Sequence, residues 1–207
     1  MDDVIVVGAG PAGNNAALGL ASRGYAVTVI DFRQKIGDKL CTGIVGLECA
    51  RLFPIDPSLV YREPCSAQVF APCAGKIRFE AATSQARVID RAGYVASFAR
   101  KARDAGARYV LGQRVLRIAP RSDGVAITTA GDRYLARALV LADGFGSPLA
   151  RQLGLGSVSD YVTGAQAVVS TSGVDEVEVH LGHDEAPGFF SWVVPTLEGQ
   201  ALIGLLA

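Results

Sequence analysis

The sequence VIVVGAGPAG, residues 4–13, decides the fold of this chain. It opens on four consecutive apolar residues, as a strand buried on both faces of a parallel sheet requires. Residues 14–22 then predict a helix, and residues 25–30 (YAVTVI) predict a second strand that leads directly into Asp31. We expect the helix to turn Ala16, Ala17 and Leu20 toward the sheet. The sequence therefore predicts a strand–turn–helix–strand unit of an α/β fold.

The turn between the first strand and the helix carries the pattern Gly8-x-Gly10-x-x-Gly13. In such a turn the first glycine permits the tight bend, the second lets the backbone approach a pyrophosphate, and the third lets the helix pack close to the strand. The helix N-terminus favours negative charge. Asp31, 18 residues beyond Gly13, is placed to accept hydrogen bonds from an adenosine ribose and to repel a 2′-phosphate. This context predicts a dinucleotide site that disfavours NADP, with a ligand-free turn as the weaker alternative.

The rest of the chain predicts further short elements. Helices are expected at residues 47–53, 91–105 and 147–153, the last with Ser147 as N-cap. The helix at 91–105 should bury Tyr94, Val95, Phe98, Ala99 and Ala102. Strands are expected at 65–71 and 76–81 around the turn 72–75, and at 108–111, 115–118, 125–129, 133–135 and 138–141. Residues 161–207 are strand-rich, and their last stretch, 200–207, has the composition of a buried strand.

Composition excludes several classes of protein. The 207 residues are 50% hydrophobic and 19% charged, which is a globular balance. Lys plus Arg equals Asp plus Glu at 20 each, and without a basic run this argues against a nucleic-acid partner. No apolar run reaches the roughly 18 residues of a membrane span. With an acidic start, we expect a cytoplasmic protein and leave peripheral membrane contact open.

The metal-binding side chains are sparse. The four cysteines, which we expect to be reduced and buried, form no CxxC pair, and His180 and His183 have no evident third ligand. We therefore expect no metal site.

A second motif lies at residues 142–147 (ADGFGS), directly after an apolar strand. Alone, Asp143-Gly144 would be an ordinary turn. Together with the first fingerprint, and with the irregular stretch after Asp31, it resembles the "ADGxxS" motif of flavoproteins with the para-hydroxybenzoate hydroxylase-like fold. The resemblance implies FAD as cofactor, with Asp143 and Gly144 near its pyrophosphate and ribityl chain.

The fold class expected from these motifs is α/β. A Rossmann-like FAD-binding domain of the para-hydroxybenzoate hydroxylase-like type is followed by the start of an antiparallel β-sheet substrate domain. The FAD-binding domain would comprise residues 1–60 and 86–157. The substrate domain would comprise residues 61–85 and 158–207.

Three further segments resemble the geranylgeranyl reductase family. Residues 39–43 (KLCTG) are similar to its "KPCGG", residues 89–94 (IDRAGY) to its "VDRxxF", and residues 187–195 (PGFFSWVVP) to its "PxxYxWxFP", with Phe190 in place of the Tyr. The resemblance implies an FAD-dependent oxidoreductase of isoprenoid lipid metabolism. Such an enzyme reduces C=C bonds of a prenyl lipid or prenyl diphosphate by hydride transfer from reduced flavin. NAD(P)H or another reductant would be the electron donor.

The resemblance also implies roles for individual residues of a cofactor site. Ala12 would lie in the phosphate turn with Gly8, Gly10 and Gly13, while Asp31 and Arg33 would face the adenosine. Cys41, Thr42 and Gly43 would pass close to the flavin ring. Arg91 would reach the FAD phosphates, unless it is a solvated first-turn residue. Val115 would offer backbone groups to the adenine, unless it is simple core.

Three side chains are candidates for contact with substrate or for catalysis. Cys41 is the one candidate for a catalytic residue, with a small apolar filler as the alternative. Strand alternation puts Phe190 and Trp192 on one face, as an apolar wall for a prenyl chain or as plain core.

Other functions stay open. Residues 190–195 partly echo the "WxWxIP" motif of flavin-dependent halogenases, so a flavin monooxygenase or halogenase is the first alternative. An electron-transfer flavoprotein dehydrogenase is the second, although the cysteines supply no iron–sulfur motif. A fragment with a structural or binding use only is the third. The apolar end of the chain suggests the front part of a longer protein. We therefore expect residues 1–207 alone to bind FAD weakly and to turn over nothing.

Overall fold

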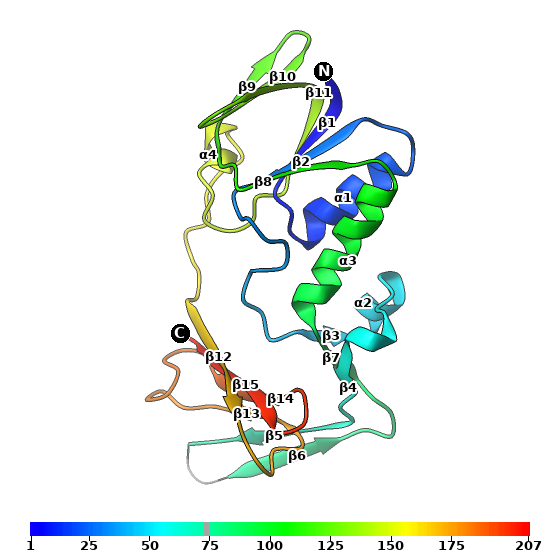
Figure 1. The fold of residues 1–207 in the computed structure, drawn as a ribbon. Coiled ribbons are helices and arrows are strands. Elements are labelled where there is room, and N and C mark those ends of the chain that lie inside the picture. The colour runs from blue at the N-terminus through cyan, green and yellow to red at the C-terminus, as the bar shows by residue number, and fades with distance from the viewer. Residues whose placement is uncertain (73–74) are drawn as a thin grey trace. The chain divides into compact units, whose positions relative to one another are not determined.

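The structure is a computed structural model that describes residues 1–72 and 75–207, and the chain divides into two compact units (Figure 1). Unit 1 comprises Met1–Lys39 and Ala92–Ser159, and unit 2 comprises Leu40–Arg91 and Asp160–Ala207. By their contacts, residues 40–60 and 86–91 group with unit 2, whereas the sequence suggested the FAD-binding domain for them. The reason is a small sheet in which β3 (Ile44–Gly46) and β4 (Val60–Arg62) both pair with β7 (Ala86–Ile89).

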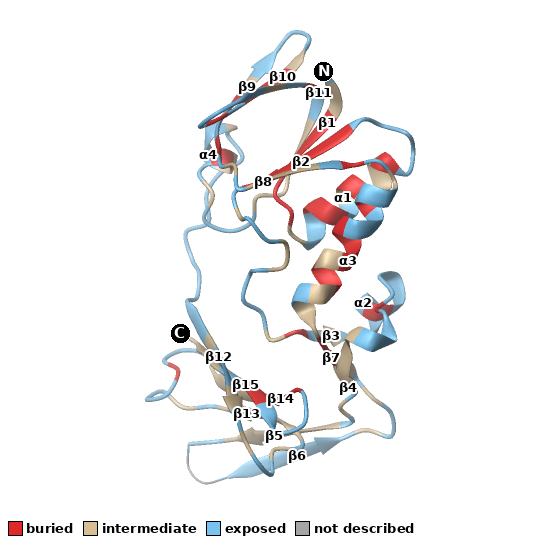
Figure 2. Cartoon of the chain, viewed as in Figure 1, coloured by how far each residue is buried: buried red, intermediate tan, exposed pale blue. Residues whose placement is uncertain are grey.

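Unit 1 is built on a six-stranded sheet whose order is β8-β2-β1-β11-β10-β9. The bounds are β8 (Arg108–Leu111), β2 (Val27–Asp31), β1 (Asp2–Val7), β11 (Arg133–Leu141), β10 (Gly124–Thr129) and β9 (Val115–Arg121). Strands β8, β2, β1 and β11 are parallel to one another, and the two remaining pairs, β11 with β10 and β10 with β9, are antiparallel. Residues 4–7 of β1 are buried, as the apolar run predicted, and the buried residues of this unit gather along β1, β2 and the helices (Figure 2).

The helices of unit 1 are α1 (Pro11–Ala21), α3 (Arg91–Asp104, whose first residue groups with unit 2) and α4 (Leu149–Gln152). The five apolar positions expected inside α3 are all buried, which confirms that prediction. In α1 the expected face holds for Ala17, which is buried, and for Leu20, which is half-buried and packs against the core of β1 and β2; Ala16 is half-buried and is not part of that cluster. The buried stripe is Gly13, Asn14, Ala17 and Ala21, because positions four residues apart share one face of a helix.

Several boundary predictions in unit 1 are wrong: α1 begins at Pro11 and not at residue 14, and β9 continues to Arg121. Residues 133–141 form one strand and not two: β11 pairs with antiparallel β10 through Ala136, then continues as the parallel partner of β1. The backbone of β11 therefore stays extended where its hydrogen-bonded partner changes from β10 to β1. Helix α4 has Pro148 at its N-cap, while the Ser147 Oγ accepts a hydrogen bond from the Leu149 N–H at 3.3 Å.

Unit 2 contains α2 (Leu47–Leu52), the short 3-10 helix η1 (Pro57–Leu59) and a second six-stranded sheet of order β12-β15-β14-β13-β5-β6. The bounds are β12 (Gly164–Ser170), β15 (Gln200–Leu206), β14 (Ser191–Pro195), β13 (Val177–His180), β5 (Ser66–Phe70) and β6 (Lys76–Glu80). The expected antiparallel sheet is present, and one pair, β5 with β13, is parallel. The turn expected at 72–75 includes residues 73 and 74, which lie outside the described residues.

Burial in unit 2 is lower than the sequence suggested. Strand β15 has hydrogen-bonded neighbours on both sides, yet only Ala201 in it is buried, and Ile203 is 37% exposed. Pairing satisfies the backbone of a central strand but does not cover its side chains. Cys41, Cys49 and Cys65 are exposed free thiols, against the expectation of buried ones, because they lie in loops and on a short helix. Cys73 lies outside the described residues.

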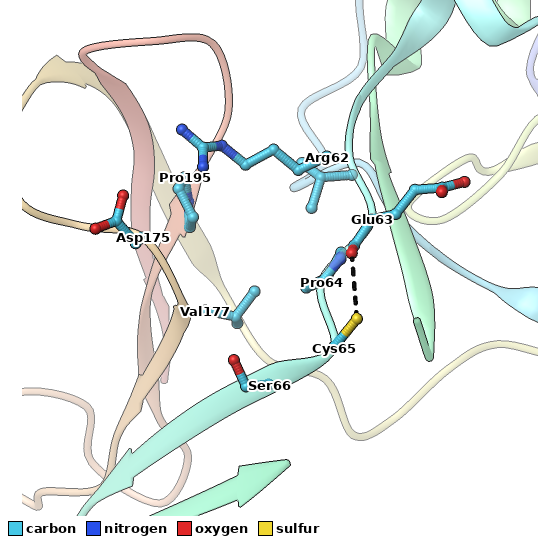
Figure 3. Close-up of a pocket in the computed structure, with 9 residues that line it drawn as sticks. Arg62, Glu63, Pro64, Cys65, Ser66, Asp175, Val177 and Pro195 are labelled. Carbon is cyan, nitrogen blue, oxygen red and sulfur yellow. Dashed lines mark hydrogen bonds between the residues drawn. The ribbon is translucent and has the colours of Figure 1, made fainter. Parts of the chain in front are cut away.

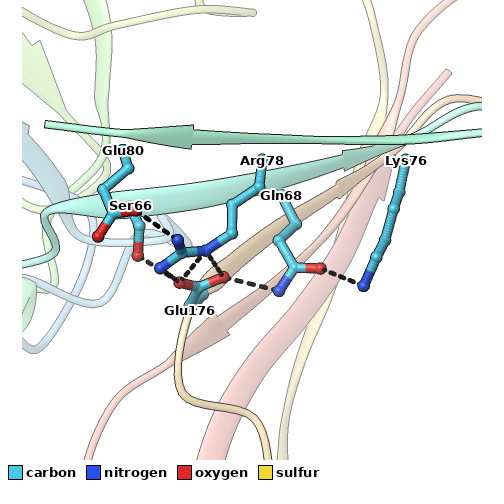
Figure 4. Close-up of polar contacts among 6 residues, drawn as sticks. All are labelled: Ser66, Gln68, Lys76, Arg78, Glu80 and Glu176. Carbon is cyan, nitrogen blue, oxygen red and sulfur yellow. Dashed lines mark hydrogen bonds and ion pairs between the residues drawn. The ribbon is translucent and has the colours of Figure 1, made fainter.

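A polar cluster ties the β5–β6 hairpin to the segment that precedes β13 (Figure 4). The Glu176 carboxylate accepts hydrogen bonds from the Arg78 guanidinium at 2.5 Å, the Ser66 hydroxyl at 2.5 Å and the Gln68 amide at 2.6 Å. These donors, Arg78 first, lower the pKa of Glu176 to about 2. Arg78 also pairs with Glu80. The carboxylate therefore stays ionised and holds together residues about 100 positions apart in the sequence.

Candidate functional site

The fingerprint loop lies between β1 and α1, and its three glycines differ in what they meet. Gly8 has φ +105°, and a Cβ there would overlap the Ala142 carbonyl oxygen. A Cβ on Gly13 would overlap the Gly8 carbonyl oxygen. A Cβ on Gly10 would meet nothing within 4 Å, and its φ of −77° suits any residue. The fold therefore needs glycine at positions 8 and 13, whereas at Gly10 it keeps open space beside a helix N-terminus.

Asp31 ends β2 directly beside this loop. Its side chain is only 7% exposed, and its Oδ2 accepts a hydrogen bond from the Ala9 N–H at 2.6 Å. Its Oδ1 accepts from the Arg33 N–H at 2.7 Å. A carboxylate has about four acceptor sites, so these two bonds leave capacity for a ribose hydroxyl. Asp31 therefore also fastens the fingerprint loop, a role that the sequence did not reveal.

The segment after Asp31 is joined to the turn between β8 and β9. The Gln113 N–H donates to the Asp31 carbonyl and the Gly112 N–H to the Arg33 carbonyl, both at 3.0 Å. Arg33 and Arg114 both place their guanidinium groups over the Phe32 ring, 4.4 and 4.3 Å from its centroid. No pattern in the sequence singled out Phe32 and Arg114. Arg114 reaches the Phe32 ring because backbone hydrogen bonds join residues 112–113 to residues 31–33, which are distant in sequence.

Val115 begins β9, which is an edge strand of the sheet. Its side chain is 8% exposed and packs in a core cluster with Ile118, Val125 and Ile127. The alternative of simple core therefore describes its side chain. The backbone of an edge strand still has one side without a strand partner, which is the feature that contact with an adenine would use.

The Asp143–Gly144 loop packs against the fingerprint loop. The Ala142 N–H donates to the Val7 carbonyl at 2.8 Å, and a Cβ on Gly8 would lie 3.1 Å from the Asp143 Cα. The Asp143 Oδ2 is buried, and no described residue donates a hydrogen bond to it. A buried carboxylate oxygen that accepts no hydrogen bond is rare in native proteins. This atom, together with the open space at Gly10, fits a dinucleotide whose hydroxyl groups and phosphates would complete the site.

The other predicted cofactor residues lie in unit 2. Gly43 is buried with φ +75°, its carbonyl accepts from the Ile89 N–H at 3.0 Å, and a Cβ on it would lie 3.6 Å from the Arg91 Cβ. Thr42 is half-buried and Cys41 is exposed. The carbonyl of Cys41 accepts from the Gln166 amide at 3.3 Å. Unit 2 therefore brings residues 41–43 and Arg91 together, while unit 1 gathers the remaining cofactor residues.

Of the predicted substrate residues, Trp192 lies in β14 and Phe190 directly precedes that strand. Their rings are in edge contact, 6.0 Å between centroids and 65° between planes. Phe189 stacks on Phe190 at 4.9 Å. A Cβ on Gly204 would overlap the Trp192 indole, so the missing side chain of that glycine leaves room for the ring. The Trp192 Nε1 is buried with no acceptor among the described residues.

The sheet register extends the apolar surface beyond these rings. Val179 lies opposite Trp192, Val69 opposite Val179, and Ile77 opposite Val69, so the four share one face across four strands. On the same strands the opposite face carries Glu178, Gln68 and Arg78. One face of this part of the sheet is therefore apolar, while the other mixes these polar side chains with apolar ones such as Val193 and Phe70.

A cavity of about 340 Å³ lies elsewhere in unit 2 (Figure 3). Its lining includes Arg62, Cys65, Asp175 and Pro195, and the Arg62 Nε donates to the Thr196 carbonyl at 2.9 Å. It contains none of the predicted site residues.

None of the helices among the described residues has the length and apolar character of a membrane span.

Comparison with known families agrees with this geometry. The family model described as FAD dependent oxidoreductase matches residues 48–205, and that described as FAD binding domain matches residues 3–41. The chain belongs to the FAD dependent oxidoreductase family. Membership confirms the predicted fold class and FAD as the cofactor of its family.

Individual members of the family are similar over nearly the whole chain. Digeranylgeranylglycerophospholipid reductase of Methanosarcina mazei is 30% identical over 98% of this chain and 54% of its own length, and that of Methanothrix thermoacetophila is 30% identical over 98% and 56%. These matches confirm the resemblance to geranylgeranyl-type reductases. The chain spans about half the length of the curated relatives it matches.

Solved structures give the same fold. A geranylgeranyl bacteriochlorophyll reductase-like protein from Thermoplasma acidophilum superposes with a TM-score of 0.84 at 28% identity, over 100% of this chain and 56% of its own. The halogenase PltM in complex with phloroglucinol and FAD has a TM-score of 0.74 at 18% identity, over 98% and 51%. At that identity the halogenase likeness shows the fold alone.

Proposed function

We propose that this chain forms the FAD site and part of the substrate site of a reductase that hydrogenates C=C bonds in a prenyl lipid or prenyl diphosphate. The observation that carries the proposal is the meeting of two loops in unit 1. The fingerprint loop leaves space at Gly10, and the loop after β11 buries the Asp143 Oδ2, to which no described residue donates a hydrogen bond. Bound and reduced, FAD would supply the hydride.

The cofactor residues have distinct tasks in this proposal. The backbone at Gly8, Gly10, Ala12 and Gly13 would hold the pyrophosphate at the N-terminus of α1. Asp31 and Arg33 would face the adenosine, and the edge of β9 at Val115 the adenine. Asp143 and Gly144 would bind the ribityl chain. In unit 2, Arg91 would pair with a phosphate, while residues 41–43, with the Cys41 thiol, would lie along the flavin.

The apolar face around Trp192 supports a prenyl substrate. Its side chains, from Phe190 across to Ile77, offer no charge and few hydrogen bonds, so what they bind best is hydrocarbon. The relatives named above act on lipids with geranylgeranyl chains, as their names state. Phe190 lacks the hydroxyl that the family motif places there, so this chain would recognise the hydrocarbon without that polar contact.

The electron donor in this proposal is NAD(P)H or another reductant that reduces the flavin without occupying the dinucleotide site. The Asp31 carboxylate next to the fingerprint loop disfavours a 2′-phosphate there.

The cofactor is tested by titrating the chain with FAD and following flavin fluorescence, with NAD as control. The expected result is saturable quenching of the flavin fluorescence as FAD binds the chain, which added NAD does not reverse. Asp31→Ala should weaken FAD binding roughly tenfold or more, because both the ribose acceptor and a support of the loop are lost. A chain that binds NAD as well as FAD would contradict the proposed site.

The substrate is tested through Trp192, the single tryptophan of the chain. Geranylgeranyl diphosphate should change the indole emission saturably, and Phe190→Ala should weaken that binding. Inorganic diphosphate, which lacks the hydrocarbon, is the matched control. An equal response to both ligands would contradict recognition of the prenyl chain.

Turnover distinguishes a reductase from its closest alternatives. The assay uses a longer protein that contains this chain, because residues 1–207 alone are expected to turn over nothing. With dithionite-reduced FAD under anaerobic conditions, a reductase adds two hydrogen atoms per double bond to digeranylgeranylglycerophospholipid, which mass spectrometry detects. A monooxygenase or halogenase instead consumes oxygen with oxidation of its substrate. Oxygen uptake coupled to an oxidised product would replace the proposed reaction.

A further inference from the structure

Asn14 is a fully buried polar side chain of unit 1. It lies in the first turn of α1 and is 0% exposed. A buried amide is costly unless it is hydrogen-bonded. Its Nδ2 donates to the Ala9 carbonyl at 2.9 Å, with the Val95 carbonyl at 3.4 Å, and its Oδ1 accepts from the Tyr109 hydroxyl at 2.9 Å. The amide therefore links the fingerprint loop to α3 and β8.

The chemistry of the partners fixes the orientation of this amide. The Ala9 carbonyl can only accept, so the nitrogen of Asn14 must face it. The oxygen then faces Tyr109, whose hydroxyl must donate. Burial raises the pKa of Tyr109 to about 12, so this hydroxyl keeps its proton at neutral pH. The arrangement has one consistent direction of donation, from Tyr109 through Asn14 to the loop.

Ala9 is thereby held at both of its backbone polar groups. Asp31 accepts from its N–H, and Asn14 donates to its carbonyl. The Ala9–Gly10 peptide is trans, so the Ala9 carbonyl and the Gly10 N–H lie in one plane and point in opposite directions. With the carbonyl turned inward to Asn14, the Gly10 N–H turns outward. No described residue accepts a hydrogen bond from it, and the space beside Gly10 is open.

We propose that Asn14 is the positioning residue that aims the Gly10 N–H at a phosphate of the bound dinucleotide, with Tyr109 holding Asn14 in register. This inference rests on the proposed FAD site and adds to it the hydrogen bonds by which Asn14 and Tyr109 support the fingerprint loop. Asn14 and Tyr109 act through the peptide plane of Ala9, and neither needs to contact the cofactor.

The test follows the Gly10 amide resonance by ¹⁵N NMR while the chain is titrated with ADP, which carries the diphosphate, or with adenosine, which does not. In the wild-type chain, ADP should shift the Gly10 resonance saturably. Asn14→Leu, of similar shape but without hydrogen-bonding groups, should weaken ADP binding roughly tenfold and leave adenosine binding within about twofold. Tyr109→Phe, which keeps the ring, should weaken ADP binding by about threefold. Tyr134→Phe is the matched control, because its hydroxyl bonds Gln113 and not Asn14.

The outcomes separate the two proposals. No response of Gly10 to ADP in the wild-type chain would overturn the FAD site and this role together. A wild-type response that persists with equal affinity in Asn14→Leu and Tyr109→Phe would overturn only the role of Asn14. Equal loss of ADP and adenosine binding would mean general damage and would also overturn it. Should Asn14→Leu not fold, the comparison of Tyr109→Phe with Tyr134→Phe decides alone.

Discussion

At the scale of single residues, the three glycines of the fingerprint are glycines for different physical reasons. Gly8 and Gly13 lie against carbonyl oxygens of the protein itself, so their substitution is a matter of folding. Gly10 has an ordinary φ and no neighbour that a methyl group would touch. If the fold does not require glycine there, the remaining reason is the close approach of a ligand to the backbone.

Gly10→Ala should therefore uncouple stability from cofactor binding. We expect the free energy of unfolding to change by less than about 1 kcal/mol, because the conformation suits alanine. FAD affinity should fall roughly tenfold or more, since the methyl group would occupy space meant for the phosphate. Urea unfolding without FAD and quenching of flavin fluorescence measure the two quantities.

Gly13→Ala is the matched control and should lower the free energy of unfolding, because the new Cβ would overlap the Gly8 carbonyl. Unchanged FAD affinity in Gly10→Ala would show that the open space serves no phosphate.

At the scale of elements, prediction from sequence succeeded where one face of an element is uniformly apolar. The run at residues 4–7 gave β1, and the periodicity of residues 94–102 gave α3 with its buried positions. It failed where a partner distant in sequence decides. The continuity of β11 depends on a change of partner from β10 to β1, and the burial of Asn14 depends on Tyr109. Pairs of this kind leave no periodic signal.

The Glu176 cluster gives a prediction for the β5–β6 hairpin. The pKa of Glu176 is lowered from its ordinary 4.5 to about 2, so its stabilising effect is complete above about pH 4.5 and is lost as the pH falls toward 2. Glu176→Gln should therefore lower the free energy of unfolding at pH 7, and the difference from wild type should shrink between pH 4.5 and 2. Urea unfolding at a series of pH values measures this.

Glu80→Gln serves as the comparison, because Glu80 is more exposed than Glu176 and its one ion pair among the described residues is with Arg78. It should have a smaller effect at pH 7. A deficit in Glu176→Gln that is the same at every pH would contradict a role for the ionised carboxylate.

At the scale of the whole molecule, the two units differ in how much core they have. Both large clusters of buried side chains belong to unit 1, around β1 and β2. In unit 2 the strands of the large sheet are mostly half-buried or exposed, and side chains such as Ile77 and Phe79 are more than half exposed. Local stability follows the density of buried apolar contacts. Unit 1 is therefore expected to be the more stable of the two.

Hydrogen exchange tests this difference and the position of the cofactor together. Amides of β1, β2 and β11 should exchange more slowly than those of β12, β14 and β15, because opening unit 1 exposes more apolar surface. FAD at 100 times its dissociation constant should add about 2.7 kcal/mol of protection to the elements that bind it. If the two loops of unit 1 carry most of the binding, that increase should appear first in β1, α1 and β2. Protection gained only in the sheet of unit 2 would place the cofactor elsewhere, and would contradict a site built on Gly10 and Asp143.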